Sequence, residues 1–347
     1  MKKIKLLACC LLVTSLFLTG CASSFQEAIG NVTQESLKRN SYLTYNDLSI
    51  SKKLGDFVLY LAQMNHEKEA YITNTENFSK EAIWTEDAKA QTKTTIISML
   101  KERLALLSKA KELGITISDT DKKKNEVEVK TQLGNKYLNI PVEYMADKGI
   151  LLDEDLLTQW IELNQISQQV YTKMYENATE VSDIKQAIKY QDIQIKVIND
   201  DAATANETAQ KVKAEFDKAT DVNTLASNYN SQVIENIEID GVKSTLLSDE
   251  VQKNVLAMEV GDIAVFEEKN NDKVVLYHVI KITDKNSESL LNEAAAKNTQ
   301  VSKQEQVNAE IQKIVKEIYV NEDLLNSFEF DLNKKFWDDR KESLLLN

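Results

Sequence analysis

The sequence is poor in the residues that interrupt regular secondary structure. Its 347 residues include only 8 glycines and a single proline, Pro141. Phosphate-binding loops, many-turned β-sandwiches and dinucleotide-binding folds each need glycine at several special backbone positions, so the composition argues against all three. The motifs Gly-x-Gly-x-x-Gly and Gly-Lys-Ser/Thr are both absent. The scarcity of helix breakers favours long helices instead.

Side chains that bind metals or act as nucleophiles are scarce as well. Two of the three cysteines, Cys9 and Cys10, lie in an N-terminal apolar run, which leaves Cys21 as the only other cysteine. The two histidines, His66 and His278, are far apart in the sequence. A disulfide framework, a free catalytic thiol and a zinc enzyme are therefore disfavoured. We expect no metal and no cofactor.

Acidic residues outnumber basic ones. The whole chain has 42 Lys and Arg against 55 Asp and Glu, and three of the lysines precede residue 21. The remaining chain has 39 basic and 55 acidic residues, a formal charge of −16. Nucleic-acid binding needs basic surface to meet phosphates, so we expect no nucleic-acid partner. The acidity also keeps the chain soluble and repels it from anionic lipid headgroups.

The first twenty residues have the layout of an export signal. Three lysines among the first five residues precede an apolar run from Leu6 to Leu18, which is shorter than the roughly 20 residues that a bilayer core requires. The run ends in Leu18-Thr19-Gly20-Cys21, which resembles the lipobox of bacterial lipoproteins. This resemblance implies that Cys21 is acylated and holds the mature chain to the extracytoplasmic face of a cell membrane. The alternative is an ordinary secretory peptide beside a chance cysteine.

The chain from residue 21 to residue 185 has the pattern of a helical domain. Apolar residues recur every three or four positions from Thr92 to Leu113, Gly114 is placed to end that helix, and Ser118 is placed to cap the next. Pro141 is positioned where a helix can start. Asp153 is a predicted cap for a further helix. The apolar positions of that helix are Leu156, Trp160, Leu163, Ile166, Val170 and Met174.

The pattern changes to a mixture of strands and helices near Asp192. Residues Asp192–Val197 alternate between polar and apolar, which is typical of a half-buried strand. The predicted helices are Glu207–Ala219, Val222–Tyr229 and Ser248–Met258. The predicted closing hairpin pairs Ile263–Phe266 with Val274–Thr283 through a turn at Asn270-Asn271-Asp272. Together these elements predict a compact α+β domain.

Three blocks of this region are similar to the parvulin-type peptidyl-prolyl isomerase domain. Asp221–Tyr229 resembles the family's "DFxxLAxxYS" helix, Leu256–Ile263 its "fxLxxGei" segment, and Tyr277–Asp284 its "GYHIIKVTD" strand. The resemblance covers Asn206 to Asp284. The helical segments on both sides resemble the N-terminal and C-terminal parts of the PrsA/SurA class of extracytoplasmic foldases, in which the isomerase domain is inserted into a helical chaperone domain.

The resemblance implies an α+β fold in four parts. These are a signal peptide over residues 1–20, a helical chaperone domain over 21–185, a parvulin-like domain over 186–285, and a C-terminal helix and tail over 286–347 that pack on the N-terminal helices. The C-terminal helix is expected from Ser289 to Tyr319, with an apolar stripe that includes Val301. Phe328–Leu332 alternates like a strand. Phe336 and Trp337 either dock this tail or form a homodimer contact.

The family's active-site positions are largely changed in this chain. The resemblance places the first-strand histidine of parvulins at Gln194, and the methionine and phenylalanine of the prolyl pocket at Leu247 and Val251. Tyr277 and His278 match the family pair. These matches imply peptide binding at Gln194, Leu247, Val251 and Tyr277, and catalysis at His278. The alternative for His278 is a buried histidine that closes a hydrogen bond within the sheet.

The remaining polar positions of the site are also replaced. The family's acidic or thiol residue falls near Gln232, and its Gly-Gly-Asp-Leu-Gly loop is replaced by Glu238–Gly241. Rotation about the peptide bond before proline has a barrier of roughly 20 kcal/mol, and preorganised polar groups are often the largest contribution to catalysis. We therefore predict weak or no isomerase activity. An extended apolar peptide can still bind, because it needs only a groove and exposed backbone groups.

The sequence thus predicts a membrane-anchored extracytoplasmic foldase or chaperone. Its expected partners are unfolded or newly secreted polypeptides, and the membrane through Cys21. An active peptidyl-prolyl isomerase is the first alternative, and a purely structural lipoprotein, which would need no exposed groove, is another. A solute-binding lipoprotein is disfavoured because that fold needs two α/β lobes with many glycine-containing turns.

Overall fold

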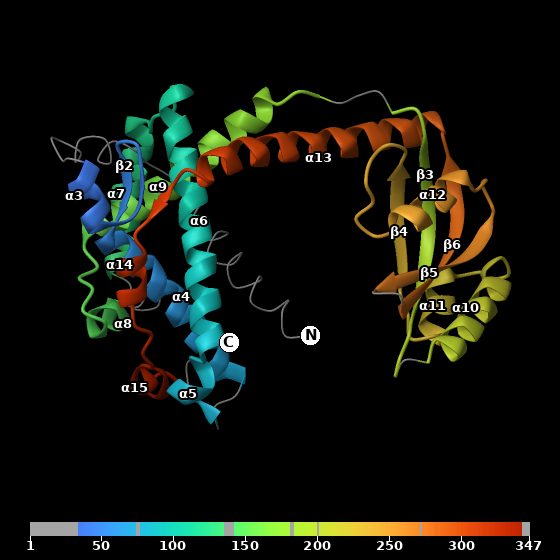
Figure 1. Cartoon of the computed structure of the whole chain (residues 1–347), viewed down its shortest axis with the longest axis horizontal. Helices are drawn as coiled ribbons and strands as arrows, with labels where there is room; N and C mark the ends of the chain where they lie inside the picture. Colours follow the sequence, from blue (N-terminus) through green and yellow to red (C-terminus); the bar gives the residue numbers. More distant parts are fainter. Residues whose placement is uncertain are drawn as a thin grey trace. The chain divides into compact units, whose positions relative to one another are not determined.

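A computed structural model describes residues 34–73, 77–134, 142–180, 184–199, 201–270 and 273–341. The chain is α+β and divides into two compact units, which Figure 1 shows with their helices and strands labelled. Unit 1 is Met1–Ala178 with Gln306–Asn347, and unit 2 is Thr179–Glu305. The export signal, Cys21 and Pro141 lie outside the described residues. No helix in the described ranges combines the length and apolar character needed to cross a bilayer.

Unit 1 is mainly helical and contains one small sheet. Its sheet has the order β2-β1-β7 and is antiparallel, with β1 at Ser41–Tyr45, β2 at Leu48–Ser51 and β7 at Tyr319–Val320. Its described helices are α3 (Gln34–Asn40), α4 (Lys52–Thr73), α5 (Lys80–Ile83), α6 (Glu86–Glu112), α7 (Asp119–Gly134), α8 (Val142–Asp147), α9 (Glu154–Asn177), the end of α13 (Glu288–Val315), α14 (Glu322–Ser327) and α15 (Lys334–Asp338).

Local capping signals place the helix ends where the sequence predicts them. Gly114 has a φ of +64° directly after α6, the left-handed conformation that glycine adopts without a Cβ clash. The hydroxyl of Ser118 accepts a hydrogen bond from the backbone N–H of Asp121, and Asp153 accepts one from Leu156 at 2.8 Å. Each cap satisfies a backbone donor that the first helical turn leaves unpaired. The predicted end of α6 and the predicted caps of α7 and α9 are therefore confirmed.

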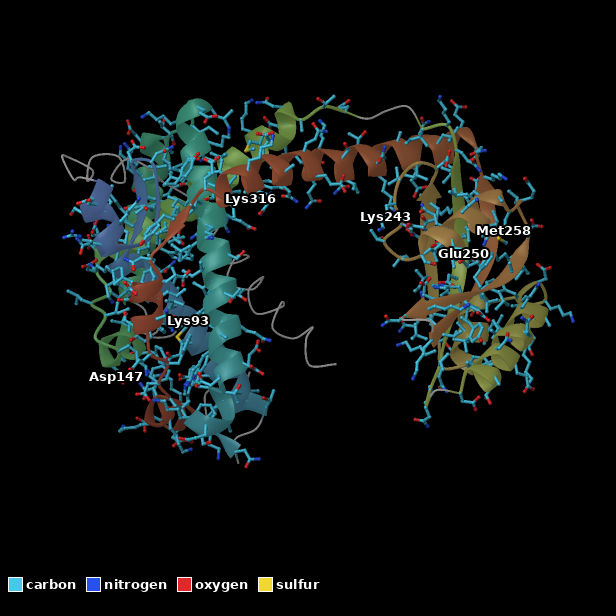
Figure 2. All side chains as sticks on the ribbon, in the orientation of Figure 1. Lys93, Asp147, Lys243, Glu250, Met258 and Lys316 are labelled. Carbon is cyan, nitrogen blue, oxygen red and sulfur yellow. The ribbon has the colours of Figure 1, made fainter. Side chains whose placement is uncertain are left out.

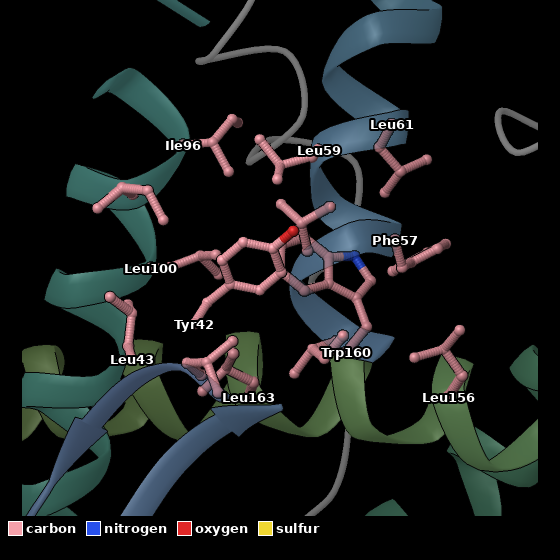
Figure 3. Close-up of a cluster of buried hydrophobic side chains, with 14 of the residues drawn as sticks. Tyr42, Leu43, Phe57, Leu59, Leu61, Ile96, Leu100, Leu156, Trp160 and Leu163 are labelled. Carbon is pink, nitrogen blue, oxygen red and sulfur yellow. The ribbon is translucent and has the colours of Figure 1, made fainter. Parts of the chain in front are cut away.

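The core of unit 1 lies between α4, α6 and α9. Figure 3 shows Tyr42, Phe57, Leu100 and Trp160 converging from β1 and these three helices, and all four are buried. Phe57 and Trp160 meet edge to face, with ring centroids 6.2 Å apart. The predicted apolar positions of α9 from Leu156 to Val170 are buried in this core, and Met174 packs against it.

The C-terminal segment completes the same core. Val307, Ile311 and Ile314 are buried together with the N-terminal helices. Val301 is 40% exposed, so the prediction that it belongs to the apolar stripe is wrong, because the stripe that packs into unit 1 begins only at Val307. The helix itself ends at Val315, and Tyr319 belongs to β7.

The tail beyond α14 docks through aromatic side chains rather than as a strand. Phe328 and Phe330 are buried, which explains why apolar and polar residues alternate here. Residues 328–333 pair with no strand in the described chain, so the strand prediction is wrong. Phe330 stacks on Trp84 with centroids 4.3 Å apart. Phe336 and Trp337 are both buried in the core of unit 1. The indole N–H of Trp337 donates to the Glu67 carboxylate at 2.7 Å.

Unit 2 is a four-stranded antiparallel sheet with helices on both faces. The strand order is β4-β3-β6-β5, with β3 at Ala187–Lys196, β4 at Val233–Ile239, β5 at Ile263–Asn270 and β6 at Lys273–Lys285. The helices are α10 (Ala202–Phe216), α11 (Val222–Asn228) and α12 (Asp249–Ala257). The first part of α13 also belongs to this unit.

The predicted hairpin and helices of unit 2 are present. β5 and β6 pair over Ile263–Asn270, although two residues of the predicted turn, Asn271 and Asp272, lie outside the described residues. α10 begins at Ala202, five residues earlier than predicted, because Asp201 caps it by accepting from the backbone of Thr204. β4 was not predicted.

Candidate functional site

Side-chain alternation sorts the residues of the unit 2 sheet onto two faces. Ile193 and Ile195 of β3 and Tyr277 and Val279 of β6 point toward α10 and α11 and share one hydrophobic cluster. Tyr190 and Ile280 share a second cluster with residues of α12. His278 alternates with Tyr277 and Val279, so it points to the α12 face. Lys243, Glu250 and Met258 mark the segment around α12 in Figure 2.

His278 is fully buried on this face and bonded to a carboxylate. Its Nδ1 lies 2.7 Å from Oδ2 of Asp192, which is only 2% exposed. An ionised carboxylate only accepts hydrogen bonds, so the imidazole donates from Nδ1. The Asp192 carboxylate also accepts from the side-chain amide of Gln194 at 3.1 Å. This is the geometry expected of a histidine that closes a hydrogen bond within the sheet.

The second ring nitrogen of His278 faces another acid. Nε2 lies 3.8 Å from Oε2 of Glu268, beyond hydrogen-bond distance, and has no hydrogen-bond partner among the described residues. Glu268 itself accepts from the backbone N–H of Ser248 at 3.1 Å. Ser248 is the residue that precedes α12. The carboxylate of Glu268 therefore faces the imidazole ring of His278 and also accepts a hydrogen bond at the start of α12.

A second buried carboxylate, Glu238, organises the neighbouring part of the face. Its Oε1 accepts from the hydroxyl of Tyr190 at 3.2 Å and from the hydroxyl of Ser244 at 2.8 Å, and its Oε2 accepts from the amide of Gln252 at 2.9 Å. Asn236 donates a further hydrogen bond. Burial raises the pKa of Glu238, and these hydrogen bonds partly offset that increase by stabilising the anion. Burial also raises the pKa of the Tyr190 hydroxyl.

The residues expected to form a prolyl pocket are packed into the core. Leu247 is 5% exposed and Val251 is 4% exposed. Both contact the cluster that contains Tyr190 and Ile280, with Phe266 packed against it. Their apolar surface is therefore covered by the sheet and is not available to a peptide in this conformation.

The structure does not bring together all the residues that the resemblance singled out. His278, Leu247 and Val251 lie on the α12 face, whereas Tyr277 points to the opposite face and is buried beside α10 and α11. Gln194 is half-buried and lies near the end of β3, where it lines a groove of about 720 Å³. The groove is bounded by the end of β3, the start of α10 and the segment that joins α11 to β4.

Sequence reasoning missed the three acids of this face. Asp192 opens the strand that the alternation predicts, but its contact with His278 depends on the pairing of β3 with β6, in which Gln194 lies opposite His278. Glu238 was read as part of a loop, although Val233–Ile239 alternates in the manner of a strand. Within the described residues, no group of three or more His, Cys, Asp or Glu side chains is arranged to hold a metal ion.

Comparisons with known proteins find similarity only among solved structures. No model of a known protein family matches the chain, and no curated protein matches it either. The foldase PrsA of Streptococcus pneumoniae matches with 16% identity and a TM-score of 0.30, over 75% of this chain and 94% of that chain. The peptidylprolyl isomerase PrsA of Bacillus cereus matches with 20% identity and a TM-score of 0.31, over 76% and 93%.

A third match is the PrsA peptidylprolyl isomerase of Bacillus anthracis, with 19% identity and a TM-score of 0.30, over 62% of this chain and 96% of that chain. Identities and TM-scores this low establish no activity for the chain. The chain is similar to PrsA foldase structures from several bacteria, the same class that its sequence motifs resemble.

Proposed function

We propose that this chain is a lipid-anchored extracytoplasmic chaperone or foldase that binds unfolded secreted polypeptides. In this proposal unit 1 is the helical chaperone domain, and unit 2 is an inserted parvulin-like domain with little or no isomerase activity. The export signal and the Leu-Thr-Gly-Cys sequence that ends at Cys21 support the location. The three parvulin-like sequence blocks support the assignment of unit 2.

The burial of His278 is the observation that carries the functional proposal. An isomerase must present polar groups to the twisting peptide bond beside a pocket for proline. Here the only histidine of unit 2 has no exposed surface and is bonded to Asp192. Leu247 and Val251 are covered in the same way. Groups in this arrangement stabilise the sheet but do not contact a substrate.

The groove at the end of β3 supports a binding role. It is lined by apolar side chains such as Ile198 and Tyr229 together with neutral polar ones such as Gln194 and Thr204. Ile198 is 71% exposed, so its apolar surface is accessible to a ligand in the groove. An exposed groove of this kind counts against a purely structural lipoprotein.

One observation favours the alternative of an active isomerase. Asp192 and Glu238 are two buried carboxylates on the face that the resemblance identifies with catalysis. The sequence alone had not predicted an acidic side chain there. If α12 moves to open this face, both could act on a peptide. Activity that disappears in a Glu238→Gln variant, with the fold intact by circular dichroism, would establish this alternative.

The binding proposal is tested by protection of an unfolded client from aggregation. The soluble chain from Ala22 onward is mixed with chemically unfolded client protein, and light scattering is followed after dilution. We expect scattering to fall at near-stoichiometric amounts of the chain. The same amount of an unrelated acidic protein is the control. Scattering equal to the control would refute the chaperone proposal.

The anchoring proposal needs its own measurement. Cells that express the full chain or a Cys21→Ala variant are labelled with radioactive palmitate. We expect label on the wild-type chain only, and release of the variant from the membrane fraction. Label-free wild-type chain would refute lipidation.

The homodimer remains a proposal, and sedimentation of the soluble chain at several concentrations tests it.

A further inference from the structure

Strand β3 extends beyond the strand that pairs with it on one side. The β3–β4 ladder ends at the pair Ile193 and Val233, whereas the β3–β6 ladder continues to the pair Lys196 and Leu276. The backbone N–H of Val197 also donates to the carbonyl of Val275 at 3.1 Å. The last residues of β3 therefore have a strand of the described chain on their β6 side only.

The free side of this strand carries outward-pointing backbone groups. In an antiparallel ladder the N–H and C=O of one residue point to the same neighbour, and successive residues alternate between neighbours. Val197 bonds to the β6 side, so the N–H and C=O of Lys196 point to the β4 side. The carbonyl of Gln194 points the same way and accepts from the hydroxyl of Ser231 at 2.8 Å. No strand of the described chain lies opposite Lys196.

The chain turns away from this position and leaves a groove beside it. Asn230 has a φ of +53°, which ends the run from α11 and delays β4 until Val233. The groove of about 720 Å³ lies along the free side of β3. A volume of this size falls within the range of ligand-binding clefts.

The lining of the groove indicates what it can hold. Among the lining residues that the structure describes, Lys196 and Asp201 alone carry charge, one positive and one negative. The other lining side chains are apolar or are neutral amides and hydroxyls. A strongly charged ligand finds no net complement here. An extended backbone with uncharged side chains finds backbone partners on one wall and apolar contacts at Ile198 and Tyr229.

We propose that an extended, uncharged segment of a client polypeptide binds in this groove as an added strand, antiparallel to β3 and hydrogen-bonded to the backbone of Lys196. The inference rests on the proposed chaperone function and adds the binding mode and the segment chemistry. The short free edge offers few hydrogen bonds, so binding is weak and reversible, which suits a protein that must release its clients.

A proline substitution tests the backbone contact. Lys196→Pro removes the N–H that points into the groove and no bond to β6, because that N–H does not point toward β6. The control is Glu235→Pro on β4, where register places the N–H on the outer edge of the sheet, away from the groove. The probe is a fluorescein-labelled octapeptide of alternating Val and Thr, with binding to the full soluble chain followed by anisotropy. We expect about a tenfold loss of affinity for Lys196→Pro and no change for Glu235→Pro.

Methylated probes give a second readout that needs no variant. One octapeptide carries N-methyl groups on every Val and another on every Thr, so each blocks the donors along a single edge of the strand. Binding as an added strand predicts that one of the two methylated peptides loses affinity and the other retains it. Equal affinity of both, or equal loss in both, would overturn the inference, as would wild-type affinity in a folded Lys196→Pro chain.

The outcomes separate this inference from the proposed function. If the wild-type chain suppresses client aggregation but binds the octapeptide no better than the folded Lys196→Pro chain does, the function stands and the added-strand inference is wrong. If the wild-type chain fails to suppress aggregation, the proposed function itself is wrong.

Discussion

α4 packs closely against Tyr42 of β1 at Gly55, so replacing this glycine by alanine should destabilise unit 1. A Cβ atom at residue 55 would lie 2.1 Å from a ring carbon of Tyr42, far inside van der Waals contact. The Tyr42 ring is fully buried, and its hydroxyl donates to Asp56 at 2.6 Å. The ring can therefore move only by disturbing the core and this hydrogen bond.

The expected size of the effect follows from three contributions. Alanine in place of glycine stabilises a helix interior by about 1 kcal/mol. Overpacking a core costs about 1–3 kcal/mol, and loss of a hydrogen bond to a charged group costs about 1.5–3 kcal/mol. We therefore expect Gly55→Ala to lower the free energy of unfolding by about 3 kcal/mol. Gly134→Ala in α7 is the matched control, because no described atom outside its own helix and its chain neighbours lies within 4 Å of the added Cβ.

Urea denaturation followed by tryptophan fluorescence measures this directly. All three tryptophans, Trp84, Trp160 and Trp337, belong to unit 1, so the signal reports the unit that contains Gly55. With a typical dependence of about 2 kcal/mol per molar urea, the midpoint should fall by roughly 1.5 M for Gly55→Ala. Gly134→Ala should be unchanged or slightly more stable. A Gly55→Ala chain as stable as the wild type would refute the close approach of Tyr42 to α4.

Three further outcomes are expected. Trp337→Phe keeps most of the buried ring but removes the N–H that Glu67 accepts, and urea titration should show a loss of about 2 kcal/mol; an unchanged midpoint would contradict this. Burial raises the pKa of Glu67 above its ordinary value of 4.5, so the folded state binds this proton more tightly than the unfolded state. Unit 1 should therefore lose stability as the pH rises from 4.5 through the raised pKa, and Glu67→Gln should remove this part of the slope. Asp153→Ala removes the cap of α9 and should lower the free energy of unfolding by about 1 kcal/mol in the same titration. An unchanged free energy of unfolding would contradict the cap.

Features that depend on neighbouring residues in the sequence were predictable. The caps at Gly114 and Asp153 and the apolar stripe of α9 are local signals, and the structure has each of them where expected. The hairpin of β5 and β6 was predictable for the same reason. The small sheet of unit 1 was missed: its β1–β2 hairpin is local and turns at Asn46 with a φ of +51°, whereas β7 at Tyr319–Val320 pairs with β1 from the other end of the chain. Two residues of strand carry too little pattern to reveal such a partner.

The candidate site was predictable in its residue types and not in its contacts. The sequence marked His278 and left open whether it is catalytic or buried within the sheet. Its partner Asp192 follows from the register between β3 and β6, and a shift of one residue would place Asp192 on the opposite face. Alternation along one strand reveals the faces but not the register. The opposite placement of Tyr277 was within reach of the sequence, because adjacent residues of a strand point to opposite faces of the sheet.

The central claim is that unit 2 does not catalyse proline isomerisation, and a protease-coupled isomerisation assay tests it most directly. The substrate is a chromogenic tetrapeptide with a single Xaa-Pro bond, and the soluble chain is assayed beside a His278→Gln variant whose folding is checked by circular dichroism. The account predicts that the wild-type chain leaves the slow isomerisation, which takes tens of seconds or more unaided, at its uncatalysed rate. Catalysis by the wild-type chain that is lost in the folded His278→Gln variant would contradict it.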